Sequence, residues 1–145
     1  MSRVINTSSP AQQRNHWRRT IAEILRHLML KRKLDQEARD MAATLVYALR
    51  GIEATIEQST LAWEKRNYYL KADRYRREWE WVAVFAKRLG RIVQEDAWDQ
   101  LPSELAQLAP YFKDIRVVAF TRDASAWQSN YTTLRSELEA ESKSL

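Results

Sequence analysis

Residues 62 to 93 read AWEKRNYYLKADRYRREWEWVAVFAKRLGRIV, and the rest of the chain can be organised around this stretch. It contains three of the six Trp, three of the six Tyr and nine of the 24 Lys and Arg residues. Its apolar residues recur every three or four positions, which is the spacing of one face of an α-helix. The sequence therefore predicts one amphipathic helix that starts between Asn67 and Asp73 and buries Tyr75, Trp79, Val82, Ala86, Leu89 and Val93.

A second face of this predicted helix lies about 140° around the axis from the buried face. The acidic residues Asp73 and Glu80 lie only at its margin. An ordinary solvent-exposed face mixes charges of both signs, so a Trp among four Arg is unusual there. The residues of this face are Arg74, Arg77, Trp81, Arg88 and Arg91.

The composition limits the class of protein. The chain has 145 residues, of which 45% are hydrophobic and 30% charged, and this suits a single helical domain over residues 1–145 with residues 1–8 and 140–145 frayed. Two Gly and three Pro are few for a sheet protein with many tight turns. The absence of Cys removes disulfides, Cys-based zinc sites and thiol catalysis. No apolar run approaches the roughly 18–20 residues that span a bilayer, and a signal peptide is not evident, so we expect a cytoplasmic protein without a membrane partner.

Two helices are predicted before this stretch. Ser9 can cap the first, and Pro10 suits its first helical position, so this helix runs to about residue 33. Asp35 can cap the second, whose unbroken apolar stripe extends to about residue 66. Gly51 lies inside the second helix, where Gly costs roughly 1 kcal/mol relative to Ala. A close contact between two helices is the expected reason for it.

Short helical segments and a final helix are predicted after this stretch. Pro102 and Pro110 interrupt the region that follows it. The run from Asp114 to Phe120 contains IRVVAF and looks β-like, but it has no partner strand, so we interpret it as helix or extended connector. Thr121 or Asp123 can cap a last helix. The predicted fold class is therefore all-α, a compact bundle of four main helices plus a short helical connector. The face of the last helix comprises Phe120, Ala124, Trp127, Tyr131, Leu134 and Leu138.

Charge alternates in sign along the chain. Residues 1–33 carry eight Lys and Arg against one acidic residue, and residues 61–91 carry nine against four. Residues 34–60 carry two against five, and residues 92–110 carry none against four. On the first predicted helix, Arg19, Arg26 and Lys33 recur every seventh residue and fall on one side. Either neighbouring helices neutralise each other, or the two basic segments converge on one basic surface.

No set of residues points to catalysis or to a bound metal. His16 and His27 lie eleven residues apart on the first predicted helix, with Glu23 one turn from His27. Tight metal sites need three or four converging ligands, however, and the Glu-x-x-His pairs of di-iron bundles are absent from the sequence. Gly-rich phosphate loops and nucleophile motifs are absent from it as well. We therefore expect no enzymatic activity, no metal and no cofactor.

The residues with the clearest binding potential are aromatic and basic. Tyr68, Tyr69 and Trp81 lie among Arg and Lys, and such rings can stack on unpaired bases while the cations contact phosphates. The alternative is that Arg side chains stack on these rings within the protein and that the Arg face only keeps the bundle soluble. The residues predicted to bind nucleic acid are Arg19, Arg26, Lys33, Tyr68, Tyr69, Lys71, Arg74, Arg76, Arg77, Trp81, Arg88 and Arg91.

The run KADRYRREWEW extends from Lys71 to Trp81. With this run, its length, its helical pattern and its basic balance, the chain resembles the small helical subunits of type III CRISPR effector complexes, which act in antiviral defence. Those subunits are helical bundles without enzymatic activity that stack along the guide–target duplex and contact its backbone through Lys and Arg. The resemblance implies a homo-oligomer or filament in which the acidic segments 34–60 and 92–110 face basic neighbours. It implies backbone contacts by Arg74, Arg76, Arg77, Arg88 and Arg91.

Two functions therefore follow as hypotheses from the sequence. The first is a non-catalytic subunit of a ribonucleoprotein assembly that binds the backbone of nucleic acid, with RNA or a guide–target duplex favoured. The second is an adaptor that uses its basic face to bind an acidic protein partner. Salt distinguishes them, because affinity for a single strand falls with a log–log slope of about −0.7 per contacted phosphate.

Overall fold

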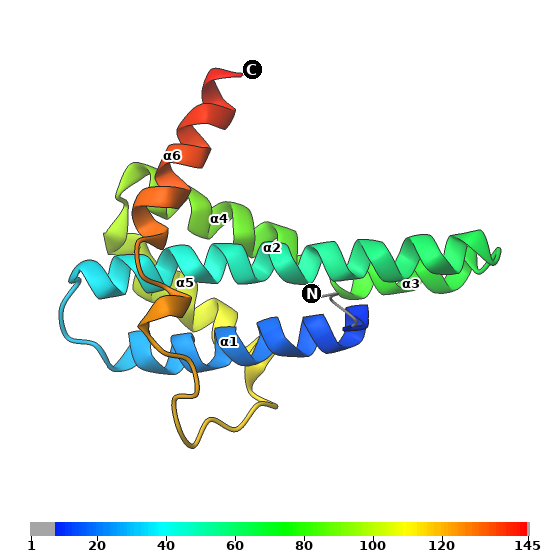
Figure 1. Ribbon diagram of the computed structural model, residues 1–145, viewed down its shortest axis with the longest axis horizontal. Helices are drawn as coiled ribbons and strands as arrows, with labels where there is room; N and C mark the ends of the chain where they lie inside the picture. Colours follow the sequence, from blue (N-terminus) through cyan, green and yellow to red (C-terminus); the bar gives the residue numbers. More distant parts are fainter. Residues whose placement is uncertain (1–7, 145) are drawn as a thin grey trace, which may run out of the picture.

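The computed structural model describes residues 8–144, and every regular element in this range is a helix. The all-α fold class predicted from the sequence is confirmed. Within this range no helix is long and apolar enough to cross a membrane. Figure 1 shows the elements: α1 (Pro10–Leu30), α2 (Gln36–Lys65), α3 (Tyr69–Glu78), α4 (Trp81–Glu95), η1 (Trp98–Gln100), α5 (Leu101–Leu108), η2 (Ala109–Phe112), η3 (Ala124–Ala126) and α6 (Asn130–Lys143).

The fraying expected at both ends of the chain falls partly outside the described residues. Positions 1–7 and 145 lie outside the described residues. Residues 140–143 belong to α6.

Helices α1 and α2 form a long antiparallel hairpin (Figure 1). Ser9 begins α1 with a reciprocal cap, in which its hydroxyl accepts the N–H of Gln12 and the Gln12 side chain accepts the N–H of Ser9. Asp35 caps α2 by accepting a backbone N–H from the first turn. Both predicted starts are confirmed, as is the end of α2 near residue 66. Helix α1, however, ends at Leu30, so Lys33 lies in the following loop and not on the helix.

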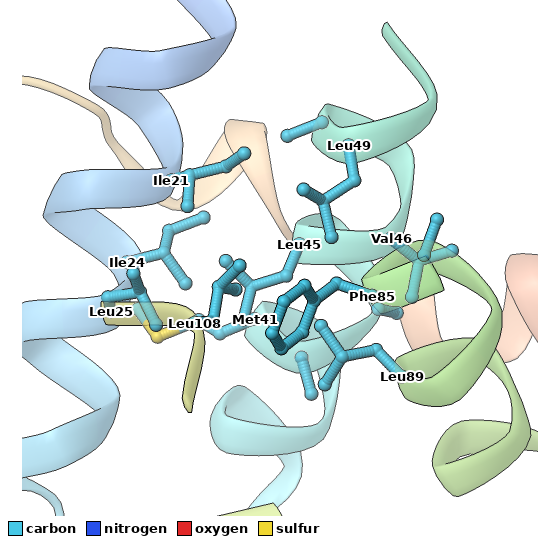
Figure 2. Close-up of a cluster of buried hydrophobic side chains, with 14 of the residues drawn as sticks. Ile21, Ile24, Leu25, Met41, Leu45, Val46, Leu49, Phe85, Leu89 and Leu108 are labelled. Carbon is cyan, nitrogen blue, oxygen red and sulfur yellow. The ribbon is translucent and has the colours of Figure 1, made fainter. Parts of the chain in front are cut away.

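The core is built around α2, which packs against α1 on one side and α4 on another. The side chains at the centre of this core are at most 6% exposed. Full burial of a side chain of this kind contributes about 1.5–3 kcal/mol, so the cluster holds the bundle together. Figure 2 shows Ile21, Ile24 and Leu25 of α1, Met41, Leu45, Val46 and Leu49 of α2, Phe85 and Leu89 of α4, and Leu108 of α5.

Gly51 marks a close approach between α1 and α2. A Cβ atom placed on Gly51 would lie 2.5 Å from Cε2 of Trp17 on α1, well inside van der Waals contact. The indole occupies the space that any side chain at this position would need. The helix–helix contact expected from the sequence is confirmed.

Gly51→Ala is therefore expected to destabilise the protein by about 1–3 kcal/mol, because the added methyl group displaces the indole of Trp17. Gly90→Ala is the matched control. Gly90 lies in α4, and a Cβ atom there meets no neighbour within 4 Å. Its substitution should instead stabilise the helix by up to about 1 kcal/mol. Urea denaturation of both variants measures the difference, and equal stabilities would contradict the close contact.

The single helix predicted from residue 67 to residue 93 is instead two helices. Helix α3 ends at Glu78, and the N–H of Val82 bonds to the carbonyl of Trp79 at 3.1 Å across the turn that follows. The turn places the rings of Trp79 and Trp81 together, with centroids 5.9 Å apart and planes at 27°. A helical wheel with one continuous axis put these residues on different faces. That prediction is wrong because the axis changes at the turn.

An extended connector (residues 113–123) follows η2 and carries the β-like run. It contains no strand, as expected for a segment without a partner strand, and it runs along α1 (Figure 1). Asp123 caps η3 by accepting the N–H of Ser125, so it does not start the last helix. Helix α6 starts at Asn130. A side chain of α2 caps its first turn, because the carboxylate of Asp40 accepts the N–H of Tyr131 at 3.0 Å.

Helix α6 packs on the bundle through a short apolar face. Trp127, which precedes it, and Leu134 are buried, while Tyr131 and Leu138 are partly buried against the core. Phe120, predicted on the same face, instead lies in the connector and is exposed. The helix therefore begins later than the sequence predicted.

Candidate nucleic-acid interface

Helix α3 folds back along the C-terminal end of α2, and Figure 1 shows their tip extending past the N-terminal end of α1. Asn67 takes up a left-handed conformation, with φ of 64°, that allows the tight turn between them. Ala72 is the buried side chain of α3. The ring of Tyr75 packs edge-on against Trp63 of α2, with centroids 5.0 Å apart. We call residues 61–78 the α2–α3 arm.

Two residues predicted to bind nucleic acid hold this arm together. Arg76 donates two hydrogen bonds to the carboxylate of Glu64, at 2.9 and 3.0 Å. These bonds lower the pKa of Glu64 and raise that of Arg76. The ammonium group of Lys71 lies 4.4 Å from the centre of the Trp63 ring. Arg76 and Lys71 therefore have partners inside the protein, which the sequence did not indicate.

Other side chains of the arm face solvent. Tyr68 and Tyr69 are 52% and 60% exposed. The side chains of Arg66 and Arg74 have no hydrogen-bond or ion-pair partner among residues 8–144. Arg77 is also exposed and pairs with Asp73, one turn away on the same helix, at 3.0 Å. We call Arg66, Tyr68, Tyr69 and Arg74 the arm tip, whereas Arg77 lies near the other end of α3. Arg66 was not among the residues predicted from the sequence.

Trp81 does not belong to the arm tip. Its ring stacks on that of Tyr111, with centroids 4.0 Å apart and planes at 17°, and it contacts Phe112 edge-on. It is half-buried against the core. The interpretation of Trp81 as an exposed ring among four Arg is therefore corrected: its partners come from η2, thirty residues further along the chain.

The two predicted Arg of α4 are also separate from the arm tip. Arg88 donates from Nε to Glu104 of α5 at 2.9 Å and from a terminal nitrogen to Gln107 at 3.1 Å. It therefore fastens α5 to α4. Arg91 is exposed and has no side-chain partner among residues 8–144, but it lies beyond the turn that separates α3 from α4.

The two basic residues of α1 that were predicted to bind nucleic acid, Arg19 and Arg26, bind the connector. Arg19 donates to the backbone carbonyl of Arg116 at 2.9 Å, and Arg26 donates to that of Val117. Lys33 lies in the α1–α2 loop, at the other end of α2 from the arm tip (Figure 1). At 1.5 Å per residue, the length of α2 separates these ends by about 45 Å. Lys33 therefore does not share a surface with the arm tip, and Arg19 and Arg26 are engaged by the connector.

Glu23 organises the contact between α1 and the connector, and the sequence had suggested it only as a neighbour of His27. Its buried carboxylate accepts hydrogen bonds from the backbone N–H groups of Thr121 and Arg122, from the Thr121 hydroxyl and from Arg19. Burial alone would raise the pKa of Glu23. The hydrogen bonds from Thr121, Arg19 and Arg122 outweigh it and lower the pKa to about 2. This carboxylate is a structural anchor that stays ionised.

The His residues are engaged in contacts rather than in a metal site. Arg122 lies 3.3 Å from Nδ1 of His16, and His27 lies 3.4 Å from the carboxylate of Glu37. No group of three or more His, Asp or Glu within the described range is arranged to hold a metal ion.

Comparisons with known proteins add no further assignment. No family model, no curated protein and no solved structure matches this chain.

Proposed function

We propose that this protein is a non-catalytic helical subunit of a ribonucleoprotein assembly that contacts the backbone of RNA through the arm tip. The single observation that carries the proposal is the combination of two exposed Tyr rings with the unpartnered cations of Arg66 and Arg74 at one projecting end of the described chain. Aromatic rings suit stacking on unpaired bases, and guanidinium groups suit phosphate. An unpartnered Arg also enters such a contact without first breaking an internal ion pair.

The proposed interface is smaller than the twelve residues predicted from the sequence. Arg19, Arg26, Arg76 and Arg88 are engaged within the protein, whereas the arm tip is free to bind. A small interface fits a subunit that adds its contacts to those of neighbours in a larger assembly. Membership of the type III CRISPR small subunits is part of this proposal, with Arg74 and Arg77 as backbone contacts.

Arg66→Glu/Arg74→Glu is expected to weaken binding of a labelled mixed-sequence single-stranded RNA by at least about tenfold, because it replaces two attractions with two repulsions. The log–log salt slope should become shallower by about 0.7 for each phosphate that the variant no longer neutralises. Arg32→Glu/Lys33→Glu is the matched control, because it makes the same change in charge at the other end of α2. Fluorescence anisotropy at two salt concentrations measures both variants. Equal weakening in the two would indicate general charge attraction and contradict an arm-tip site.

The adaptor function is the second candidate, and a specific observation favours it. Leu61 and Leu70 are 47% and 65% exposed on the same arm. Aliphatic side chains make no favourable contact with RNA phosphate. Exposed apolar and Tyr side chains with Arg are typical of protein interfaces. Wild-type protein that binds no RNA at low salt would exclude the first function and favour this one.

A further inference from the structure

A second surface lies at the end of α1, far from the arm tip. Leu30 and Val118 are each 73% exposed and Met29 is 54% exposed, which makes them among the most exposed large apolar side chains of the described chain. Leu34 and Phe120 are exposed beside them. The connector therefore covers only part of the end of α1.

This surface is hollowed in three places that share their walls. The first hollow, of about 360 Å³, lies between the α1–α2 loop and α5, with Leu101 and Leu105 in its lining. The second, of about 430 Å³, lies between α1 and the segment that contains Phe112 and Ile115. The third, of about 180 Å³, lies between α1 and the far part of the connector.

Two protruding side chains join these hollows. Met29 lines the first and the second, and Leu30 lines the second and the third. The three hollows and the ridges between them thus form one continuous apolar surface, which we call the α1-end groove. Its contour, with hollows between ridges, suits an occupant that has side chains of its own to insert.

The charge of the groove is positive. Arg32 and Lys33 line it and have no side-chain partner among residues 8–144. Lys31 lines it as well, but it is held by Asp35 and Glu37. Among the described residues that line the three hollows, the one carboxylate is that of Glu23, which is already saturated by hydrogen bonds. An occupant with carboxylates along its edge would therefore meet the free cations of Arg32 and Lys33, while the nearby carboxylates of Asp35 and Glu37 are already paired with Lys31.

We propose that the α1-end groove is the docking site for an amphipathic helix of a partner protein, with Leu-like side chains on one face and Glu or Asp beside them. Side chains three and four residues apart lie on one face of such a helix, so it can present several of them to neighbouring hollows at once. A bilayer surface has no side chains to fill the hollows. Among the residues that line the groove, single-stranded RNA would find one exposed aromatic ring for stacking, that of Phe120, on a surface that is otherwise mainly aliphatic. The groove goes beyond the proposed function, because it lies at the opposite end of α2 from the arm tip.

The probe for this site is a fluorescein-labelled synthetic helix of about 18 residues, long enough for several turns, with Leu at helical spacing and Glu elsewhere. We expect saturable, micromolar binding to the full chain that weakens with salt. A peptide of the same composition in scrambled order should bind at least about tenfold more weakly, because its Leu no longer share a face. Binding of the two peptides with equal affinity would overturn the proposal.

Two variants map the site. Leu30→Ser/Val118→Ser removes exposed apolar side chains, and Arg32→Glu/Lys33→Glu reverses the charge of the two free cations. Each variant should weaken peptide binding at least about tenfold. The melting temperature of each should stay within a few degrees of wild type, because the changed side chains are exposed. Arg66→Glu/Arg74→Glu should leave peptide binding unchanged, so a failure of the RNA proposal and a failure of this one give different results. Peptide binding that survives both groove variants would overturn the site. A different result would show that the occupant is not an amphipathic helix. In that result the peptide does not bind the wild-type protein, and the groove variants instead abolish binding to phosphatidylserine vesicles, to RNA or to a second copy of the chain.

Discussion

Glu23→Ala is expected to lower the free energy of unfolding by about 3–5 kcal/mol, the range seen when one partner of a buried charge network is removed. The substitution leaves the backbone N–H groups of Thr121 and Arg122 without an acceptor and removes the ionic partner of Arg19. Urea denaturation measures the loss. Glu37→Gln is the control, because the Glu37 carboxylate is half-exposed in its pair with Lys31 and should contribute at most about 1 kcal/mol.

The loss at Glu23 should be local as well as global. Hydrogen exchange at Thr121 and Arg122 is expected to accelerate in Glu23→Ala more than exchange in the α2 core, because the connector detaches first. Unchanged exchange in the connector, or wild-type stability of the variant, would show that the carboxylate does not hold it.

The same residue predicts a pH dependence. The pKa of Glu23 is lowered from 4.5 to about 2 in the folded protein, because hydrogen bonds to the carboxylate outweigh its burial. A lowered folded-state pKa means that the ionised carboxylate of Glu23 stabilises the folded protein, here by about 3 kcal/mol. This stabilisation is fully present above pH 4.5 and is lost as the pH falls towards 2. Glu23→Gln cannot titrate, so its stability should fall less steeply than that of wild type across this window. Parallel curves would contradict the assignment.

Trp79→Ala is expected to cost about 3 kcal/mol, at the lower end of the range for truncating a large aromatic residue. Sequence periodicity predicted that Trp79 is buried in the core. In the structure the ring is half-buried, packs against Tyr75 and Trp81 and lies 5.7 Å beneath the guanidinium of Arg14. It therefore supports the root of the α2–α3 arm. Thermal and urea denaturation measure the cost, and wild-type stability would exclude this role.

Trp79→Phe tests the contribution of the aromatic ring to stability separately from that of the indole N–H group. The indole Nε1 is buried without a hydrogen-bond partner among the described residues, so its removal relieves a cost rather than adding one. We expect this variant to lose less than about 1.5 kcal/mol, since the ring contacts with Tyr75 and Trp81 are largely kept. A loss as large as that of Trp79→Ala would indicate that the indole N–H has a partner in solution.

Features that depend on neighbours along the chain could be predicted from the sequence. The reciprocal cap at Ser9 and the cap at Asp35 lie within three residues of the groups they satisfy. The core face of α2 follows from the helical period. Gly51 indicated a close approach because Gly in a helix interior costs free energy without a packing reason, although the partner, Trp17, could not be named.

The candidate site could be predicted only in part. The exposed Tyr68, Tyr69 and Arg74 follow from their place at a helix junction. The turn after Glu78 contains no Gly or Pro, so the local sequence did not predict it. Once that turn redirects the axis, the alignment of Arg77 with Arg88 on one face no longer holds. The error came from extending a local period across a break.

By itself the sequence determined the helical class, the starts of α1 and α2, and the amount and order of charge along the chain. The tertiary structure alone decided which charges are free. Arg19 binds a backbone carbonyl 97 residues away, and Trp81 stacks on a ring 30 residues away. The reason is physical: helix periodicity depends on bonds between residues four apart, whereas the partner of a long cationic or aromatic side chain depends on which distant segment folds against it. Most of the predicted basic residues are therefore engaged in internal contacts, whereas Lys33, Arg74 and Arg91 have no side-chain partner among residues 8–144.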